Sequence, residues 1–162
     1  MTRRLRRPSV APLLSLALAV GLPAQTHTHE TPGAVVRQAV HAVEGDSVAP
    51  VQARWSARLA GDSADPAGVL GLATLARLTY DYPAADRLYP RLFDEGSPHP
   101  GAYAAYARLG LAWSLEERGR SDAAAEEFTR ARGAARAAAV PAAEAEALIG
   151  RSFARGATEG MA

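Results

Sequence analysis

The segment that most constrains this chain spans residues 104–131, with the sequence AAYARLGLAWSLEERGRSDAAAEEFTRA. Its first half has the spacing of three and four residues that one face of a helix requires, at Leu109, Ala112, Trp113 and Glu116. Gly119 follows the last periodic turn, where a residue with positive φ commonly ends a helix. Ser121 and Asp122 then offer a capping hydroxyl and a first-turn negative charge to a second helix. The short connection predicts that the two helices pack antiparallel as a hairpin.

The same pattern occurs 39 residues earlier (112−73 and 128−89). The positions of Ala112, Ala124, Phe128 and Ala131 are taken there by Ala73, Ala85, Tyr89 and Leu92. A third copy begins about 38 residues further on (149−111), where Leu111, Ala112 and Leu115 are replaced by Ile149, Gly150 and Phe153. Periods of this length are typical of helical repeats.

These positions resemble the tetratricopeptide repeat (TPR) pattern, in which Leu-Gly/Ala is followed by an apolar residue and later by Ala, an aromatic residue and Ala. One copy has Leu111-Ala112, Leu115, Gly119, Ala124, Phe128 and Ala131. The earlier copy has Leu72-Ala73, Ala76, Tyr82, Ala85, Tyr89 and Leu92. The chain departs from the pattern at the usual Trp position, which holds Val69, Arg108 and Glu146, and its period exceeds the common ~34 residues. The resemblance implies an all-α solenoid of antiparallel helical hairpins, wound as a right-handed superhelix of about seven helices.

The chain after residue 30 divides into hairpin-sized units. Thr31-Pro32 and Asp65-Pro66 each place an N-cap residue before a proline, which suits the first position of a helix. We expect residues 31–62 to form a helical hairpin without a clean repeat signature, as terminal repeats commonly do. TPR-like repeats are then expected at about 65–97, 103–140 and 141–162, the last of them partial.

The N-terminal residues have the layout of a secretory signal peptide. Four arginines precede the apolar run 10–22, and Pro23-Ala24 follows it. The run of about 13 residues is shorter than the ~20 that span a bilayer as a helix. We therefore predict a signal peptide at 1–24, a polar linker at 25–30, and a bacterial protein that is periplasmic or secreted. Cleavage after Gly21 and an uncleaved N-terminal anchor are the alternatives.

The composition limits the possible partners. The chain has no Cys, which excludes a disulfide framework and a thiolate metal site. All 18 basic residues are Arg, and the formal net charge of the whole chain is +1. From residue 25 onward there are 14 Arg and 17 acidic residues, so the net charge of that part is −3 (14−17). This balance argues against nucleic-acid binding, which needs a basic face, and no membrane contact is expected after signal cleavage.

No pattern of catalytic residues is present in the sequence. It lacks a nucleophile elbow, a phosphate-binding glycine loop, a His-Glu-x-x-His motif and a catalytic Cys. The pairs Glu116-Glu117 and Glu126-Glu127 are adjacent on their helices, so their side chains point about 100° apart and cannot share a proton. We expect them on solvated faces, paired with Arg120 and Arg130 at i, i+4. The chain is therefore not expected to be an enzyme or to hold a cofactor, and QTHTHE is expected to be solvated rather than metal-binding.

The TPR resemblance implies a concave groove lined by the first helix of each repeat. The groove positions carried over to this sequence are Thr74, Arg77, Tyr106, Leu109, Trp113, Glu116 and Arg151, with Leu70 and Ala154 beside them. Tyr and Trp next to Arg and Glu are typical of an interaction hot spot. Two placements of Trp113 stay open: in the groove, or packed between repeats against the second helix of the preceding copy.

Two functions are consistent with this sequence. The first is an exported TPR-like scaffold or interaction module that binds a peptide or protein segment in its groove. The second is the N-terminal TPR portion of a longer exported protein, with an enzymatic or signalling domain beyond residue 162; the half-repeat at 141–162 motivates it. The genomic reading frame past residue 162 separates the two.

Overall fold

The computed structural model describes residues 30–94 and 101–159, and within those ranges the chain is all-helical, with no strand. The predicted all-α class is therefore confirmed, and the packing is compatible with a helical bundle or a solenoid. The predicted signal peptide at 1–24 lies outside the described residues, as do most of the 25–30 linker and His27, His29 and His99. The helices are α1 Pro32–Glu44, α2 Val48–Gly61, α3 Pro66–Leu78, α4 Tyr82–Leu88, the 3-10 helix η1 Tyr89–Leu92, α5 Ala102–Glu117, α6 Ser121–Ala137 and α7 Pro141–Glu159.

The helix starts follow the predicted capping chemistry at some positions and not at others. The Thr31 hydroxyl accepts from the Ala34 N–H at 3.4 Å, and the Asp65 carboxylate accepts from the Ala67 N–H at 3.2 Å. Ser47 stands at the N-cap of α2 but makes no capping hydrogen bond, and its hydroxyl donates instead to the Ala42 carbonyl. Ser121 is the first residue of α6 and not its cap, which is Arg120.

Four helix connections are closed in the same way. Each has one residue with positive φ after the helix: Asp46 (50°), Tyr80 (64°), Gly119 (72°) and Ala139 (54°). In each, the next N–H donates to a carbonyl five residues back, at 2.8 Å for Ser47 and Asp81, 3.0 Å for Arg120 and 2.9 Å for Val140. This is the Schellman ending of a helix, and the prediction that Gly119 has positive φ is confirmed. Three of these turns use a residue other than glycine.

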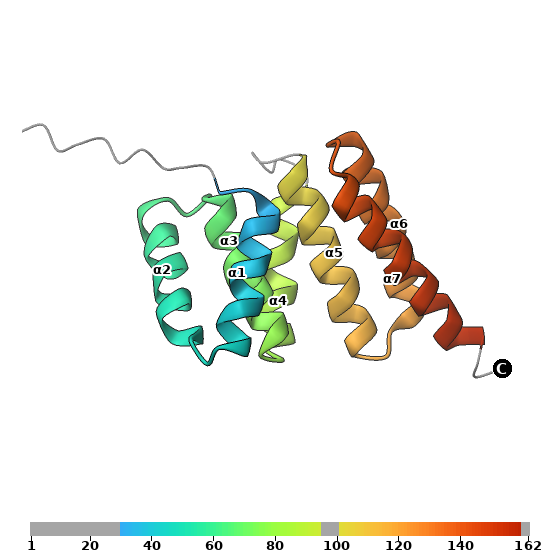
Figure 1. Cartoon of the computed structure of the whole chain (residues 1–162), viewed down its shortest axis with the longest axis horizontal. Helices are drawn as coiled ribbons and strands as arrows, with labels where there is room; N and C mark the ends of the chain where they lie inside the picture. The colour runs from blue at the N-terminus through green and yellow to red at the C-terminus, as the bar shows by residue number, and fades with distance from the viewer. Residues whose placement is uncertain (1–29, 95–100, 160–162) are drawn as a thin grey trace, which may run out of the picture.

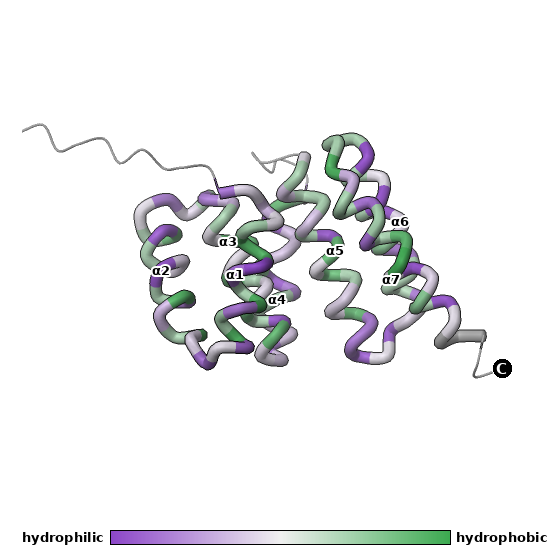
Figure 2. The backbone as a smooth tube through the Cα atoms, in the orientation of Figure 1, coloured by the Kyte–Doolittle hydropathy of each residue, from purple (hydrophilic) through white to green (hydrophobic). Residues whose placement is uncertain are grey.

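The helices follow one another across the molecule, from α1 and α2 at one end to α6 and α7 at the other (Figure 1). Two helices, α1 and α2, lie in the segment 31–62 for which we predicted a helical hairpin, and α3 packs against both of them. Strongly hydrophobic residues gather where α1, α3 and α4 meet (Figure 2). Trp55 of α2 is fully buried in the same core. A second core lies between α5, α6 and α7, and Phe128 and Ala124 are fully buried in it.

Three glycines lie directly against aromatic rings of the preceding helix. A Cβ placed on Gly71 would lie 2.3 Å from the Trp55 ring, one on Gly110 would lie 2.3 Å from the Tyr89 ring, and one on Gly150 would lie 2.3 Å from the Phe128 ring. No side chain fits at those distances, so glycine permits the ring to pack on the helix backbone. These contacts join α2 to α3, η1 to α5, and α6 to α7.

The second helix of the first predicted repeat is shorter than we expected. We predicted a repeat over about 65–97, but its second α-helix ends at Leu88 and continues as η1 only to Leu92. Pro90 explains the change, because a proline has no N–H to donate to the turn before it. Tyr89 and Leu92 are nevertheless buried, as the repeat pattern predicts.

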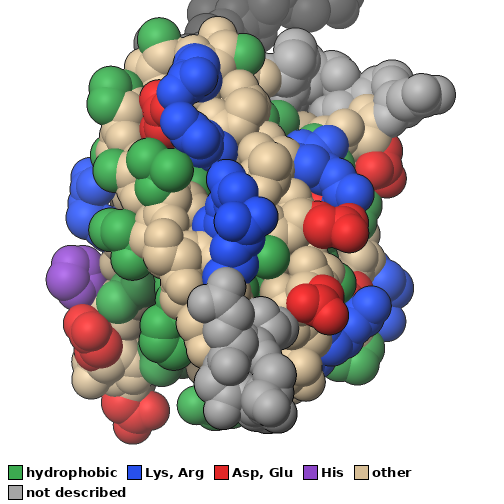
Figure 3. Space-filling view, turned by 90° about the vertical axis from the view of Figure 1, so that its right-hand side faces the viewer, with side chains coloured by type: hydrophobic (Ala, Val, Ile, Leu, Met, Phe, Trp, Pro, Cys, Tyr) green, Lys and Arg blue, Asp and Glu red, His purple; other side chains and the backbone are tan. Residues whose placement is uncertain are grey.

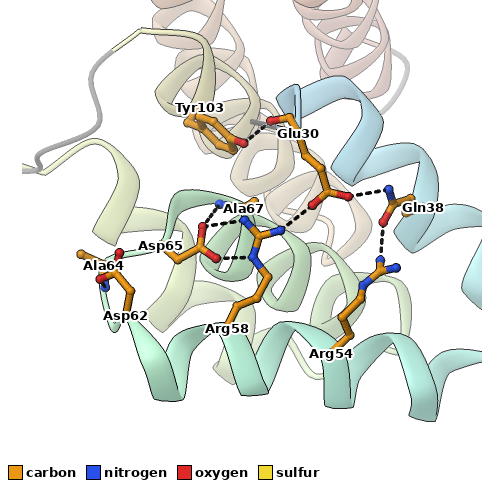
Figure 4. A network of polar contacts seen from close by, with 9 residues as sticks. All are labelled: Glu30, Gln38, Arg54, Arg58, Asp62, Ala64, Asp65, Ala67 and Tyr103. Carbon is orange, nitrogen blue, oxygen red and sulfur yellow. Dashed lines mark hydrogen bonds and ion pairs between the residues drawn. The ribbon is translucent and has the colours of Figure 1, made fainter. Parts of the chain in front are cut away.

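A polar network holds the N-terminal helices together (Figure 4). The Arg58 guanidinium lies between two carboxylates: its Nη1 donates to Glu30 at 2.7 Å and its Nη2 donates to Asp65 at 3.1 Å. The pKa of Arg58 is raised above its ordinary value, chiefly by the hydrogen bond to Asp65. Glu30 also accepts from Gln38 at 2.8 Å, and its carbonyl accepts from the Tyr103 hydroxyl. The network thus connects α1, α2, α3 and α5.

Candidate functional site

Two of the predicted groove residues lie in the core. Thr74 and Leu109 are each only 2% exposed, and the Thr74 hydroxyl donates to the Leu70 carbonyl one turn earlier at 2.8 Å. The expectation that they line a groove is corrected, because neither side chain offers surface to a partner. Leu70 and Ala154, expected beside them, are fully buried as well.

Two further predicted residues have partners inside the molecule. Arg77 donates to Glu117 and lies close to the buried hydroxyl of Tyr89, whose pKa is raised by burial. Glu116 accepts from the Ser121 hydroxyl at 3.1 Å, and its Oε2 is buried. The expected pair between Glu116 and Arg120 is replaced by this contact with Ser121. Arg77 and Glu116 therefore stabilise α5 against its neighbours.

Trp113 lies half-buried at the junction of three helices. Its ring packs edge-on against Phe128 of α6, with centroids 4.9 Å apart and the planes at 79°. Its indole Nε1 donates to the Glu146 carboxylate of α7 at 3.0 Å. The packing partner is thus the second helix of its own hairpin, and neither of the two expected placements describes it fully.

Tyr106 lies two turns before Trp113 on α5 and faces α1. A Cβ placed on Gly33 would lie 2.9 Å from the Tyr106 hydroxyl oxygen and 3.5 Å from Arg37 Nη1, so the hydroxyl and the guanidinium converge there. Partial burial raises the pKa of Tyr106, the Glu146 carboxylate raises it further, and the Arg37 charge lowers it. Glu146 therefore acts electrostatically on Tyr106 and bonds directly to Trp113.

These contacts define one surface cluster, made of Arg37, Tyr106, Trp113 and Glu146, which we call the inner cluster. It crosses α1, α5 and α7, which lie in a row because α5 contacts both of the others (Figure 1). Within the described part of the chain, Arg37 makes no hydrogen bond or ion pair and is exposed. Arg151, the last predicted groove residue, is half-buried on α7, and its nearest cluster member in sequence is Glu146.

Two members of the inner cluster, Arg37 and Glu146, were not among the groove residues that we predicted from the sequence. Arg37 belongs to the first hairpin, which has no repeat signature, so the sequence did not show which residues of that hairpin face the later helices. Glu146 had a signal, since it occupies the position where the TPR pattern has Trp. An acidic residue there was interpreted only as a departure from the pattern.

The inner cluster combines a half-buried indole, a phenol hydroxyl, one carboxylate and a guanidinium that has no hydrogen-bond or ion-pair partner among the described residues. Arg and Tyr side chains can donate hydrogen bonds to an acceptor oxygen, and an indole ring has an apolar face on which an apolar side chain can pack. Across residues 30–94 and 101–159, no group of three or more His, Asp or Glu side chains is placed to hold a metal ion. No helix in the same ranges is long and apolar enough to cross a membrane.

Comparisons with protein-family models, with curated proteins and with solved structures find no match to this chain.

Proposed function

We propose that this chain is an exported TPR-like interaction module that binds a peptide or protein segment at the inner cluster. The observation that carries the proposal is that Tyr106 of α5 and Arg37 of α1 meet beside Gly33, while Glu146 acts on Tyr106 and accepts a hydrogen bond from Trp113. Arg, Tyr and Trp are the side chains most enriched at interaction hot spots.

Two regularities support the repeat part of the proposal. The residues with positive φ in the first three hairpin turns are 34 and 39 apart (80−46 and 119−80). The glycines that meet aromatic rings are 39 and 40 apart (110−71 and 150−110). Spacings of 34 to 40 residues in both turn and packing positions are the kind that helical repeats produce.

The bound segment carries an apolar side chain next to a carboxylate. The apolar side chain packs on the Trp113 and Tyr106 rings, and the carboxylate accepts from Arg37 and from the Tyr106 hydroxyl. Glu146 repels a second carboxylate placed near the indole, so the acidic group of the ligand lies on the α1 side of the cluster.

Selection of peptides from a random library on the full chain tests the proposal. Fluorescence anisotropy then gives the affinity of each selected peptide for the wild type, for Arg37→Glu and for Arg87→Glu. Arg87 is the matched control, an exposed arginine of α4 without a partner among the described residues. We expect Arg37→Glu to weaken binding about tenfold or more, which corresponds to ~1.4 kcal/mol, and Arg87→Glu to change it less than about twofold. Equal affinity for both variants would show that the inner cluster is not the site.

A further inference from the structure

The inner cluster contains two opposite charges that are not paired with each other. Arg37 of α1 is exposed and has no hydrogen-bond or ion-pair partner among the described residues. Glu146 of α7 is exposed too, and in the same part of the chain its carboxylate accepts one hydrogen bond, from the Trp113 indole at 3.0 Å. Several acidic side chains at the end of the molecule formed by α6 and α7 lie directly beside arginines (Figure 3), and Glu127 and Glu144 each bond to two of them. Glu146 differs from these, because it keeps an oxygen that can accept from a ligand.

The two charges lie at different places along α5. The Tyr106 hydroxyl and the Arg37 guanidinium meet beside Gly33, where an added Cβ would lie 2.9 Å from the hydroxyl oxygen and 3.5 Å from Arg37 Nη1. Trp113, which holds Glu146, comes seven residues later (113−106), two turns and about 10 Å further along the same stripe of the helix. The pKa of Tyr106 is raised by burial and then by the Glu146 charge, while the Arg37 charge lowers it, so both charges act at this hydroxyl.

The hydrogen bond between Trp113 and Glu146 limits what can cover the indole. A ligand that packs on the ring also takes water away from the carboxylate, because the carboxylate lies 3.0 Å from the ring nitrogen. Removing water from a charged group costs free energy unless the ligand supplies a hydrogen-bond donor in exchange. A ligand with an acidic residue alone would pair with Arg37 and leave Glu146 without such a donor. A positively charged side chain supplies the donor and also balances the charge.

We propose that the segment bound at the inner cluster carries both charges: an acidic residue that pairs with Arg37, and a lysine or arginine that pairs with Glu146. The inference rests on the proposed function, since it names the chemistry of the segment that binds there. An extended chain advances about 3.3 Å per residue, so about three positions separate the two charged residues across the ~10 Å from Tyr106 to Trp113. The apolar residue that packs on the two rings lies between them.

Selection from a random peptide library, on the full chain and on three variants of it, tests the two charges separately. Arg37→Gln removes the positive charge and Glu146→Gln removes the negative one. The glutamine at 146 keeps an oxygen that can accept from the Trp113 indole, and the NMR signal of that indole N–H checks that the ring keeps its place. Glu126→Gln is the matched control, because the Glu126 side chain is 71% exposed on α6. Sequencing of the selected pools measures the enrichment of acidic and basic residues.

We expect wild type and Glu126→Gln to select peptides with an acidic and a basic residue about three positions apart. Glu146→Gln should lose the enrichment of basic residues and keep that of acidic residues, and Arg37→Gln should do the reverse. In fluorescence anisotropy, a labelled peptide selected on the wild type should bind Glu146→Gln about fivefold more weakly. Replacing the basic residue of this peptide by Met should weaken its binding to wild type by a similar factor, and the replaced peptide should bind both proteins equally within about twofold.

Failure of this inference and failure of the proposed function give different results. If the acidic enrichment depends on Arg37, but basic residues are not enriched or stay enriched on Glu146→Gln, the inference is overturned and the proposed function stands. If neither substitution changes the selected sequences, the peptides bind away from the inner cluster and both are overturned. The peptide with Met tests the pairing on the wild-type chain itself, so unchanged binding of that peptide overturns the inference even where Glu146→Gln displaces the indole.

Discussion

The indole Nε1 of Trp113 on α5 donates to the carboxylate of Glu146 on α7 across 3.0 Å. This hydrogen bond and the edge-on contact with Phe128 hold the ring at a fixed angle while part of it stays exposed. A ring that is already held in place loses little conformational freedom when a ligand binds to it. The relationship explains how one tryptophan belongs both to the core of its hairpin and to the inner cluster.

The contact between the Tyr89 ring and Gly110 can be tested by replacing this glycine with alanine. Gly110→Ala should destabilise the fold by about 1–3 kcal/mol, because the added Cβ would lie 2.3 Å from the Tyr89 ring and the ring has to move. Gly133→Ala on α6 is the matched control, since no atom outside its own helix lies within 4 Å of the added Cβ. That variant should gain up to about 1 kcal/mol from helix propensity. Urea denaturation of both variants measures the difference, and a stabilised Gly110→Ala would mean that the ring does not pack on this backbone.

Glu127 is buried, contrary to our expectation from the sequence, and its ion pairs can be tested by mutation. From the sequence we expected this side chain on a solvated face, but it is only 4% exposed and bonds to Arg108 at 2.7 Å and Arg130 at 2.8 Å. Its removal leaves Arg108 without its carboxylate partner, so we expect Glu127→Ala to cost about 1.5–3 kcal/mol. Phe128→Ala should cost more, about 3–5 kcal/mol, because it empties a fully buried site.

The control for this prediction is Glu126→Ala. Glu126 is 71% exposed and bonds only to Arg130 among the described residues, at 3.2 Å, as the i, i+4 spacing predicted. Such an exposed pair contributes under about 1 kcal/mol. Chemical denaturation with a double-mutant cycle through Arg108→Ala isolates the buried interaction. A cost for Glu127→Ala no larger than that for Glu126→Ala would contradict the burial of Glu127.

The sequence was sufficient to predict the helices and much of the core, for reasons visible in single residues. A proline directly after Thr31 or Asp65 is typical of the first position of a helix. Ala124, Phe128 and Ala131 are three and four residues apart, so they lie on one face of their helix, and that face is buried. The site was harder to predict, because the face of a helix on which a residue lies does not determine how deeply neighbouring helices bury that residue. Thr74 and Leu109 fell on the expected face of their helices but are covered by neighbours, and Arg37 reaches the inner cluster from a helix with no repeat signature.

Glu144 predicts a pH dependence of stability. Hydrogen bonds from Arg136 and then Arg132 lower the pKa of Glu144 below its ordinary value, with Arg136 Nη2 at 2.6 Å. A carboxyl whose pKa is lower in the folded state stabilises the fold above its unfolded-state pKa, and this contribution is lost as the pH falls through the folded-state value.

We expect Glu144→Gln to be less stable than wild type at neutral pH and to approach the wild type as the solution is acidified. Urea denaturation at a series of pH values checks this. The sign is fixed by the direction of the shift, so a difference between the two proteins that grows on acidification would contradict the assigned ion pairs of α6 and α7.

The most direct test of the inner cluster is the NMR signal of the Trp113 indole N–H. The chain has two tryptophans, and Trp55 is fully buried in the other core, so a ¹⁵N-labelled full chain gives one indole signal at the proposed site and one internal reference. Trp55→Phe assigns the two signals. Titration with a peptide selected on the full chain should shift the Trp113 signal saturably and leave the Trp55 signal in place. A peptide that saturates the protein while the Trp113 signal stays unmoved would show that binding occurs elsewhere on the molecule.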